Sequence, residues 1–159
     1  MRHVISLLVE NKVGVLARIT GLISGRGFNI DSLAVGETEN PDLSRITIIV
    51  KGDDAILEQV RKQLGKLIDV LKVVDFTNEE FVERDLMMVK VNCPIGKRGE
   101  IIEIIDIFRG RIVDVGQKDL IIEIAGTEDK LEAMLSLLKP YGIKELVQTG
   151  SIAIARGAK

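Results

Sequence analysis

The sequence predicts an α+β fold made of two tandem βαββαβ units, the order of ferredoxin-like domains. The first observation is that strand-like and helix-like stretches follow one another in this order twice along the chain. The second is the core composition: 22 Ile, 17 Leu and 16 Val, with only 3% aromatic residues, favour sheets packed against helices. The third is the length, since 159 residues with 46% hydrophobic residues suit one domain or two small ones.

The first unit is expected over residues 1–77. Val15, Ile19 and Ile23 recur at helical spacing and predict its first helix. Gly27 suits the left-handed conformation that often follows the last turn of a helix. In chain order, the expected elements are a strand over 3–10, a helix over 15–25, strands over 28–37 and 43–51, a helix that begins at Asp53-Asp54, and a strand over 70–76.

A polar, acidic linker is expected over residues 78–84, and a second small α/β domain, also ferredoxin-like, over 85–159. Thr127 is placed to cap its second helix, and Gly150 interrupts its last strand. The expected elements are a strand over 86–93, a helix that contains 101–108, strands over 111–116 and 120–125, a helix between Thr127 and Pro140, and a strand over 145–155. The two units repeat an architecture more than a sequence, because their residues match poorly.

Charge and composition exclude several classes of partner. The chain has 22 Lys and Arg against 24 Asp and Glu, and this net charge of −2 argues against a protein that coats nucleic acid or an anionic membrane. The few aromatic residues argue against RNA readers that stack bases on a sheet face. The single cysteine permits no disulfide within the chain, and no apolar run is long enough for a membrane span or a signal peptide. We therefore expect a cytoplasmic protein.

Residues able to carry catalysis or hold a metal are scarce. The chain has one histidine, His3, which we interpret as a solvated residue at a strand edge, and one cysteine, Cys93, which we interpret as a small buried hydrophobe. A metal site needs several converging His, Cys or carboxylate side chains. We therefore predict no catalytic residue, no metal site and no cofactor in this chain.

One segment has the character of a binding site. The turn that contains Asn11 and Gly14 leads directly into the helix from Val15, and the start of a helix accepts an anion such as a carboxylate. Gly14 would allow a ligand to approach the backbone closely. Asn11 could accept a hydrogen bond from an ammonium group, and Asn29 with Ile30 would add an amide and an apolar wall. The pattern fits a small apolar amino acid, although ordinary turn chemistry explains the same residues.

These residues lie in a long stretch that resembles a known family. The stretch reads VENKVGVLARITGLISGRGFNIDSLAVG, and the similarity continues through LSRITIIV, VERDLMMVKV, IFRGRIVDV and LIIEIAGTEDKLEAMLSLLKPYGIKELVQTGSIAIARG. The chain is thereby similar, over nearly its whole length, to the small regulatory subunits of acetolactate synthase. Its first unit resembles an ACT domain, a ligand-sensing module of many amino-acid enzymes.

The resemblance implies a subunit that is not itself catalytic. It would bind the large catalytic subunit of this transferase, raise its activity and confer feedback inhibition by a branched-chain amino acid, typically valine. The partner would carry thiamine diphosphate, magnesium and FAD and catalyse a first shared step of branched-chain amino-acid synthesis, including that of isoleucine. The chain would form a homodimer or larger assembly, with the effector between two ACT domains. The implied effector-binding residues are Asn11, Gly14, Val15 and Leu16 of one chain, and Asn29 and Ile30, which would come from the other.

Other functions remain open at this point. A stand-alone ACT sensor that acts on another enzyme would share the ligand site but not the partner. A small ferredoxin-like phosphatase would need a phosphate-binding loop, and the stretch from Asn11 to Arg18 contains none. An RNA-binding domain of the same topology is disfavoured by the charge balance and the few aromatic residues.

Overall fold

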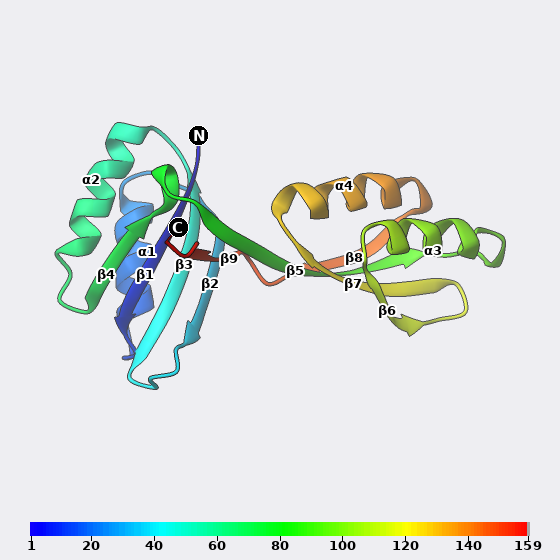
Figure 1. Cartoon of the computed structure of the whole chain (residues 1–159), viewed down its shortest axis with the longest axis horizontal. Helices are drawn as coiled ribbons and strands as arrows, with labels where there is room; N and C mark the ends of the chain where they lie inside the picture. The colour runs from blue at the N-terminus through cyan, green and yellow to red at the C-terminus, as the bar shows by residue number, and fades with distance from the viewer. Residues whose placement is uncertain (159) are drawn as a thin grey trace. The chain divides into compact units, whose positions relative to one another are not determined.

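A computed structural model describes residues 1–158, and the chain divides into two compact units. The first comprises Met1–Val82 and the C-terminal residues from Ser151 on, and the second comprises Glu83–Gly150. In each unit two helices lie on one face of an antiparallel sheet (Figure 1). This confirms the predicted α+β class with two ferredoxin-like units. No helix in the described part of the chain is long and apolar enough to cross a membrane.

The first unit contains the predicted βαββαβ order. Its sheet runs β2-β3-β1-β4, which places the first strand in the middle, paired with the third and the fourth. A short 3-10 turn, Phe76–Asn78, follows the last strand. The elements are β1 (Arg2–Glu10), α1 (Val15–Gly25), β2 (Ile30–Glu37), β3 (Leu43–Lys51), α2 (Asp54–Gly65) and β4 (Val70–Asp75).

Local sequence explains where the two helices begin and end. Val15, Ile19 and Ile23 of α1 are buried, as their spacing predicts. Gly27 follows the end of α1 with φ +83°, the left-handed conformation expected there. Asp53 caps α2, because its Oδ1 accepts a hydrogen bond from the backbone N–H of Ala55 at 2.8 Å. Because the buried apolar residues recur at helical spacing in both helices, each helix presents an apolar stripe to the inner face of the sheet.

The second unit repeats this topology. Its sheet runs β6-β7-β5-β8, and β9 also pairs with β5. Thr127 caps the second helix by accepting a hydrogen bond from the backbone N–H of Lys130, as predicted. Cys93 is fully buried in the core, which confirms its interpretation as a small hydrophobe. The elements of this unit are β5 (Phe81–Asn92), α3 (Arg98–Ile107), β6 (Arg111–Val115), β7 (Asp119–Gly126), α4 (Glu128–Leu138) and β8 (Ile143–Gln148). The last strand, β9 (Ile152–Ala155), pairs with β5 but belongs to the first unit.

The C-terminal strand corrects the expected domain boundary. The prediction placed residues 85–159 in the second domain, but the chain from Ser151 on belongs to the first unit. There Ala153 is buried in a small cluster with Val4 and Ile49, and the backbone N–H of Ser151 donates to Ser32 Oγ at 2.9 Å. Local periodicity cannot reveal this, because the contacts join residues more than a hundred positions apart.

The expected linker over residues 78–84 is partly a strand. β5 already begins at Phe81, whose ring lies 4.9 Å from that of Phe76 between centroids. Phe81 also packs against the cluster that contains Ala153. The acidic character of this stretch suggested a solvated linker, but an apolar contact made by one aromatic side chain holds it against the first unit.

Candidate ligand-binding site

Asn11 is held in place by residues that are distant in sequence. Its side-chain amide donates to Glu37 Oε1 at 3.1 Å and to the carbonyl oxygen of Pro41 at 3.0 Å. Its backbone N–H donates to the carbonyl oxygen of Asp42 at 2.8 Å. Both side-chain N–H groups are therefore used, and within the described residues no donor reaches Oδ1. The side chain is exposed, so Oδ1 is available to accept a hydrogen bond from an ammonium group.

Gly14 precedes α1 in a left-handed conformation, with φ +86°. Apart from its two neighbours in the chain, no residue that the structure describes has an atom within 4 Å of the position that a Cβ would take, so the space above Gly14 is open. Among the residues that the structure describes, no side chain caps α1, whereas Asp53 caps α2. The first-turn N–H groups of a helix carry a partial positive charge. An open approach to such a helix start can accommodate a carboxylate.

Val15 and Leu16 contribute in different ways. The side chain of Val15 is buried in the core of the first unit, so a ligand could reach only its backbone. Leu16 is half-buried and packs partly against the same core, which leaves some apolar surface exposed. Together with Asn11 and Gly14, these residues form one continuous segment between the end of β1 and the first turn of α1.

Asn29 and Ile30 lie at the opposite end of the sheet. Glu10, at the end of β1, pairs with Leu43 of β3, whereas Ile30 pairs with Val50. Since 50 − 43 is 7, the two ends are seven residues apart along β3, or roughly 24 Å at the usual rise per residue of a strand.

The structure therefore brings Asn11, Gly14, Val15 and Leu16 together, but does not bring Asn29 and Ile30 to them within one chain. Asn29 is exposed, and its amide donates to Asp31 Oδ1 at 3.1 Å. Ile30 packs partly against the core. A site that uses all six residues requires two copies of the chain.

Charged residues surround the first half of the site. Lys12 lies 2.9 Å from Glu10 between Nζ and Oε2, and the hydrogen bond to this carboxylate raises the pKa of Lys12. Arg18, on the exposed face of α1, pairs with Asp69. The cations next to Gly14 are thus already matched by carboxylates, which leaves the helix start and Asn11 as the groups free to recognise a ligand.

Nothing in the sequence pattern points to Glu37 and Pro41, which anchor Asn11. They lie 26 and 30 positions away, at the end of β2 and in the turn that follows it. Only the pairing of β2 and β1 with β3 brings them next to Asn11. The turn signal of Asn40-Pro41-Asp42 was visible in the sequence, but its contact with a distant amide was not.

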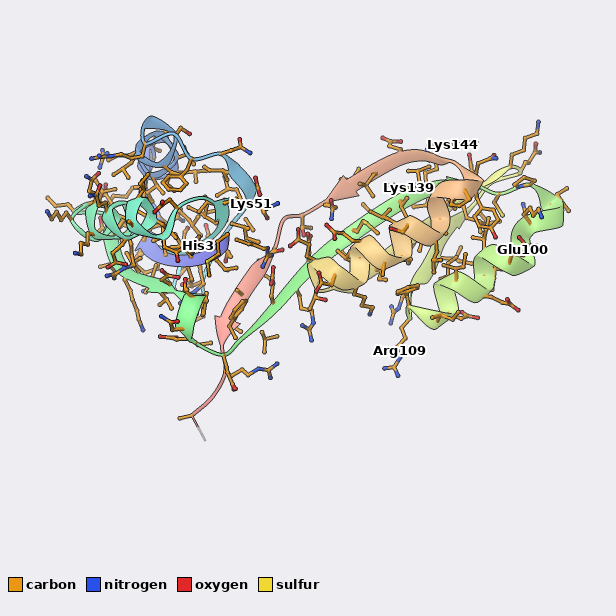
Figure 2. The ribbon with its side chains drawn as sticks, turned by 90° about the horizontal axis from the view of Figure 1, so that it is seen from above. His3, Lys51, Glu100, Arg109, Lys139 and Lys144 are labelled. Atoms are coloured by element: carbon orange, nitrogen blue, oxygen red, sulfur yellow. The ribbon has the colours of Figure 1, made fainter. Side chains whose placement is uncertain are left out.

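The prediction for His3 was wrong. The residue is 3% exposed and lies inside the first unit, as Figure 2 shows. Its Nδ1 lies 3.3 Å from Thr77 Oγ1, and its Nε2 lies 2.9 Å from Asp54 Oδ1. The start of α2 and the turn after β4 supply these contacts. Residues 1–158 contain no group of three His, Cys, Asp or Glu side chains that could hold a metal ion.

Two family models match the chain, one for each half. A model described as "AHAS small subunit-like ACT domain" matches residues 5–72, and one described as "Small subunit of acetolactate synthase" matches residues 84–157.

Full-length relatives carry the same description. The "Probable acetolactate synthase small subunit" of Archaeoglobus fulgidus is 57% identical over 159 residues, which is 100% of this chain and 99% of the relative. The acetolactate synthase small subunit of Mycolicibacterium smegmatis is 50% identical over 157 residues, 99% of this chain and 92% of the relative. The crystal structure of the acetolactate synthase small subunit from Thermotoga maritima superposes with a TM-score of 0.90 at 42% identity, and covers 100% of this chain and 99% of that one.

Proposed function

The chain belongs to the family of acetolactate synthase small subunits, and we propose that it raises the activity of the catalytic subunit and makes it sensitive to valine. The resemblance found in the sequence is confirmed, and the first unit is an ACT domain. A small subunit of this enzyme implies a catalytic subunit as partner. The identity of the effector, the activation and the dimer are parts of the proposal.

The open, uncapped start of α1 behind Gly14 is the observation that carries the proposal. The carboxylate of valine would bind there, and its ammonium group would donate to Asn11 Oδ1. Leu16 would contact the aliphatic side chain, and Asn29 and Ile30 of a second copy would close the site. The two halves lie at opposite ends of one sheet, which supports a site shared between two chains.

Valine would act by stabilising one arrangement of the paired ACT domains. A ligand shifts such an equilibrium only by its difference in affinity for the two states. A coupling of about 1–3 kcal/mol would correspond to roughly 5–150-fold regulation. Pairing of two chains through their sheets would also cover exposed strand edges, which otherwise invite unwanted association.

The catalytic chemistry is assigned to the partner in this proposal. Thiamine diphosphate, magnesium and FAD would be bound by the catalytic subunit, and no residue of this chain would act in the reaction. The cytoplasmic location remains a prediction. A stand-alone ACT sensor would have the same ligand site, so co-purification with the catalytic subunit of the same organism separates the two functions.

A mixing experiment tests the shared site. Asn11→Ala and Asn29→Ala should each abolish valine binding by their own dimers, measured by isothermal titration calorimetry. In a mixed dimer, one site lacks both asparagines and the other retains both. Unfolding and refolding the two variants together should therefore restore binding with the affinity of the unmodified protein, at about a quarter of the capacity.

The control for this experiment is Asn78→Ala, which lies in the turn after β4, at the opposite edge of the sheet from β2 and Ile30. It should bind valine like the unmodified protein, alone or mixed. No recovery in mixed dimers, despite exchange of subunits shown by mass spectrometry, would exclude a site built from two chains. Normal binding by both single variants would exclude the proposed site altogether.

A further inference from the structure

The second unit contains a cavity of its own. Its volume is ≈ 660 Å³, and it lies where β5 ends, α3 begins and β6 turns into β7. A volume of this size is within the range of small-molecule sites. The lining residues are Asn92, Pro94, Ile95, Arg98, Gln117 and Lys118.

The cavity occupies the place that the candidate effector loop has in the first unit. In both units this loop joins the first strand to the first helix, because both have the same βαββαβ order. The starts of the four α-helices also fall into two pairs. Asp53 and Thr127 cap α2 and α4, whereas no side chain in the described part of the chain caps α1 or α3. The second unit thus has the same strand-to-helix loop and the same uncapped helix start as the first. It also has a cavity there, lined by side chains that differ from those of the loop containing Asn11 and Gly14.

Arg98 is held rigidly at this cavity. Its Nη2 donates to the carbonyl oxygens of Gly116 at 2.9 Å and of Gln117 at 3.2 Å, which fixes the guanidinium against the β6–β7 turn. Its Nε is buried and has no hydrogen-bond partner among the described residues. A guanidinium that is fixed in advance loses little side-chain freedom when it binds an anion, and so favours binding.

The lining carries positive charge without a carboxylate to match it. Lys118 is exposed and makes no ion pair with any residue that the structure describes. Two acidic side chains close to these cations in the sequence are already engaged, since Glu100 accepts a hydrogen bond from the Tyr141 hydroxyl at 2.8 Å and Asp119 lies 3.1 Å from Lys144 Nζ. Figure 2 shows Glu100 and Lys144 at the same end of this unit. Two cations therefore face the cavity beside the apolar surface of Pro94 and Ile95.

We propose that this cavity binds a small aliphatic carboxylate that has no ammonium group. The carboxylate would pair with Arg98 and Lys118, and its aliphatic part would cover Ile95, which is 82% exposed without a ligand. An amino acid is disfavoured here, because its ammonium group would lie beside Arg98 and Lys118, whereas in the first unit the cations beside Gly14 are already paired with carboxylates. The second unit would thus select ligands that the site in the first unit does not. This inference does not depend on the proposed feedback by valine.

Two probes with the same carbon skeleton test the selectivity. The full chain, labelled with ¹⁵N, is titrated with 4-methylpentanoate or with L-leucine, which differs only by its ammonium group. 4-Methylpentanoate should shift the backbone amide signals of residues 92–98 and 116–118. The affinity of L-leucine, measured from the same signals, should be at least about tenfold lower than that of 4-methylpentanoate. This expectation holds whether or not L-leucine shifts the signals of residues 11–16 in the first unit.

Variants locate the site. Lys118→Gln should weaken binding of 4-methylpentanoate about tenfold, and Arg98→Gln should weaken it further. Lys118 is exposed and makes no side-chain contact that the fold requires, so its replacement leaves the unit folded. Lys97→Gln is the matched control: Lys97 lies in the same loop but pairs with Glu100 at 3.5 Å and does not line the cavity. The affinity of the Lys97→Gln variant for 4-methylpentanoate should stay unchanged.

Three results would overturn the proposal. The first is that 4-methylpentanoate shifts no amide signal of the second unit. The second is equal binding of L-leucine at residues 92–98. The third is unchanged affinity in Lys118→Gln. All three readouts come from the second unit, so they are distinct from failure of the effector site in the first.

Discussion

Replacing Gly14 by Asp or by Asn separates the effect of charge from that of shape at the start of α1. Both side chains have nearly the same size, both tolerate a left-handed conformation better than other residues with a Cβ, and both enter open space. The residue has φ +86°, so each variant should lose about 1–2 kcal/mol of folding free energy. Because Gly14 lies in the first unit, which is a domain of fewer than about 100 residues, each kcal/mol lost lowers Tm by about 4–8 °C.

The two variants should differ strongly in valine binding. If the carboxylate of valine lies about 5 Å from the carboxylate that Gly14→Asp introduces, Coulomb's law at an effective dielectric constant of about 20 gives a repulsion of about 3 kcal/mol. This corresponds to roughly 150-fold weaker binding of valine by Gly14→Asp than by Gly14→Asn.

Isothermal titration calorimetry at two salt concentrations measures this difference. The gap between the variants should narrow as salt is added, because the repelling charges lie near the surface. Gly21→Asp is a control, since it places the same charge on the exposed side of α1 with nothing within 4 Å. Equal affinities of the Asp and Asn variants for valine would refute the reasoning, because no carboxylate could then bind next to Gly14.

Three further predictions concern packing and ionisation. Ala153→Glu should destabilise the first unit by about 2 kcal/mol or more, because it buries a carboxylate next to Val4 and Ile49. The control Ile154→Glu, at a position that is 67% exposed, should change Tm little. Equal Tm values for the two variants would contradict the assignment of β9 to this unit. Gly52→Ala would place a Cβ 1.9 Å from the ring of Phe28 and should lower the free energy of unfolding, measured with urea, by about 1–3 kcal/mol. The control Gly36→Ala, which has open space around it, should unfold like the unmodified protein. The hydrogen bond from Tyr141, followed by the charge of Lys97, lowers the pKa of Glu100. The ionised Glu100 therefore stabilises the fold above the ordinary glutamate range, and this contribution is lost as pH falls through the lowered pKa. Tyr141→Phe should raise the pKa of Glu100 toward its usual value in a ¹³C NMR titration, and an unchanged pKa would contradict this cause.

Much of the candidate site could be predicted because its information is local. A glycine before an apolar helix, with an asparagine three residues earlier, indicates a possible anion-binding turn without reference to the rest of the chain. The conformation of Gly14 and the absence of a cap on α1 agree with that prediction. By contrast, the fixed orientation of Asn11 comes from Glu37 and Pro41, and no spacing in the sequence links them.

The sequence by itself determined the order of the elements, the faces they bury and the doubled βαββαβ plan. Those features follow from periods of two and 3.6 residues, which are repeated within each element. Only the tertiary structure decided that Ala153 returns to the first unit, that His3 is enclosed beside Thr77 and Asp54, and that Arg98 is fixed at a cavity by the β6–β7 turn. Each of these depends on single contacts between distant segments, and single contacts leave no periodic pattern in a sequence.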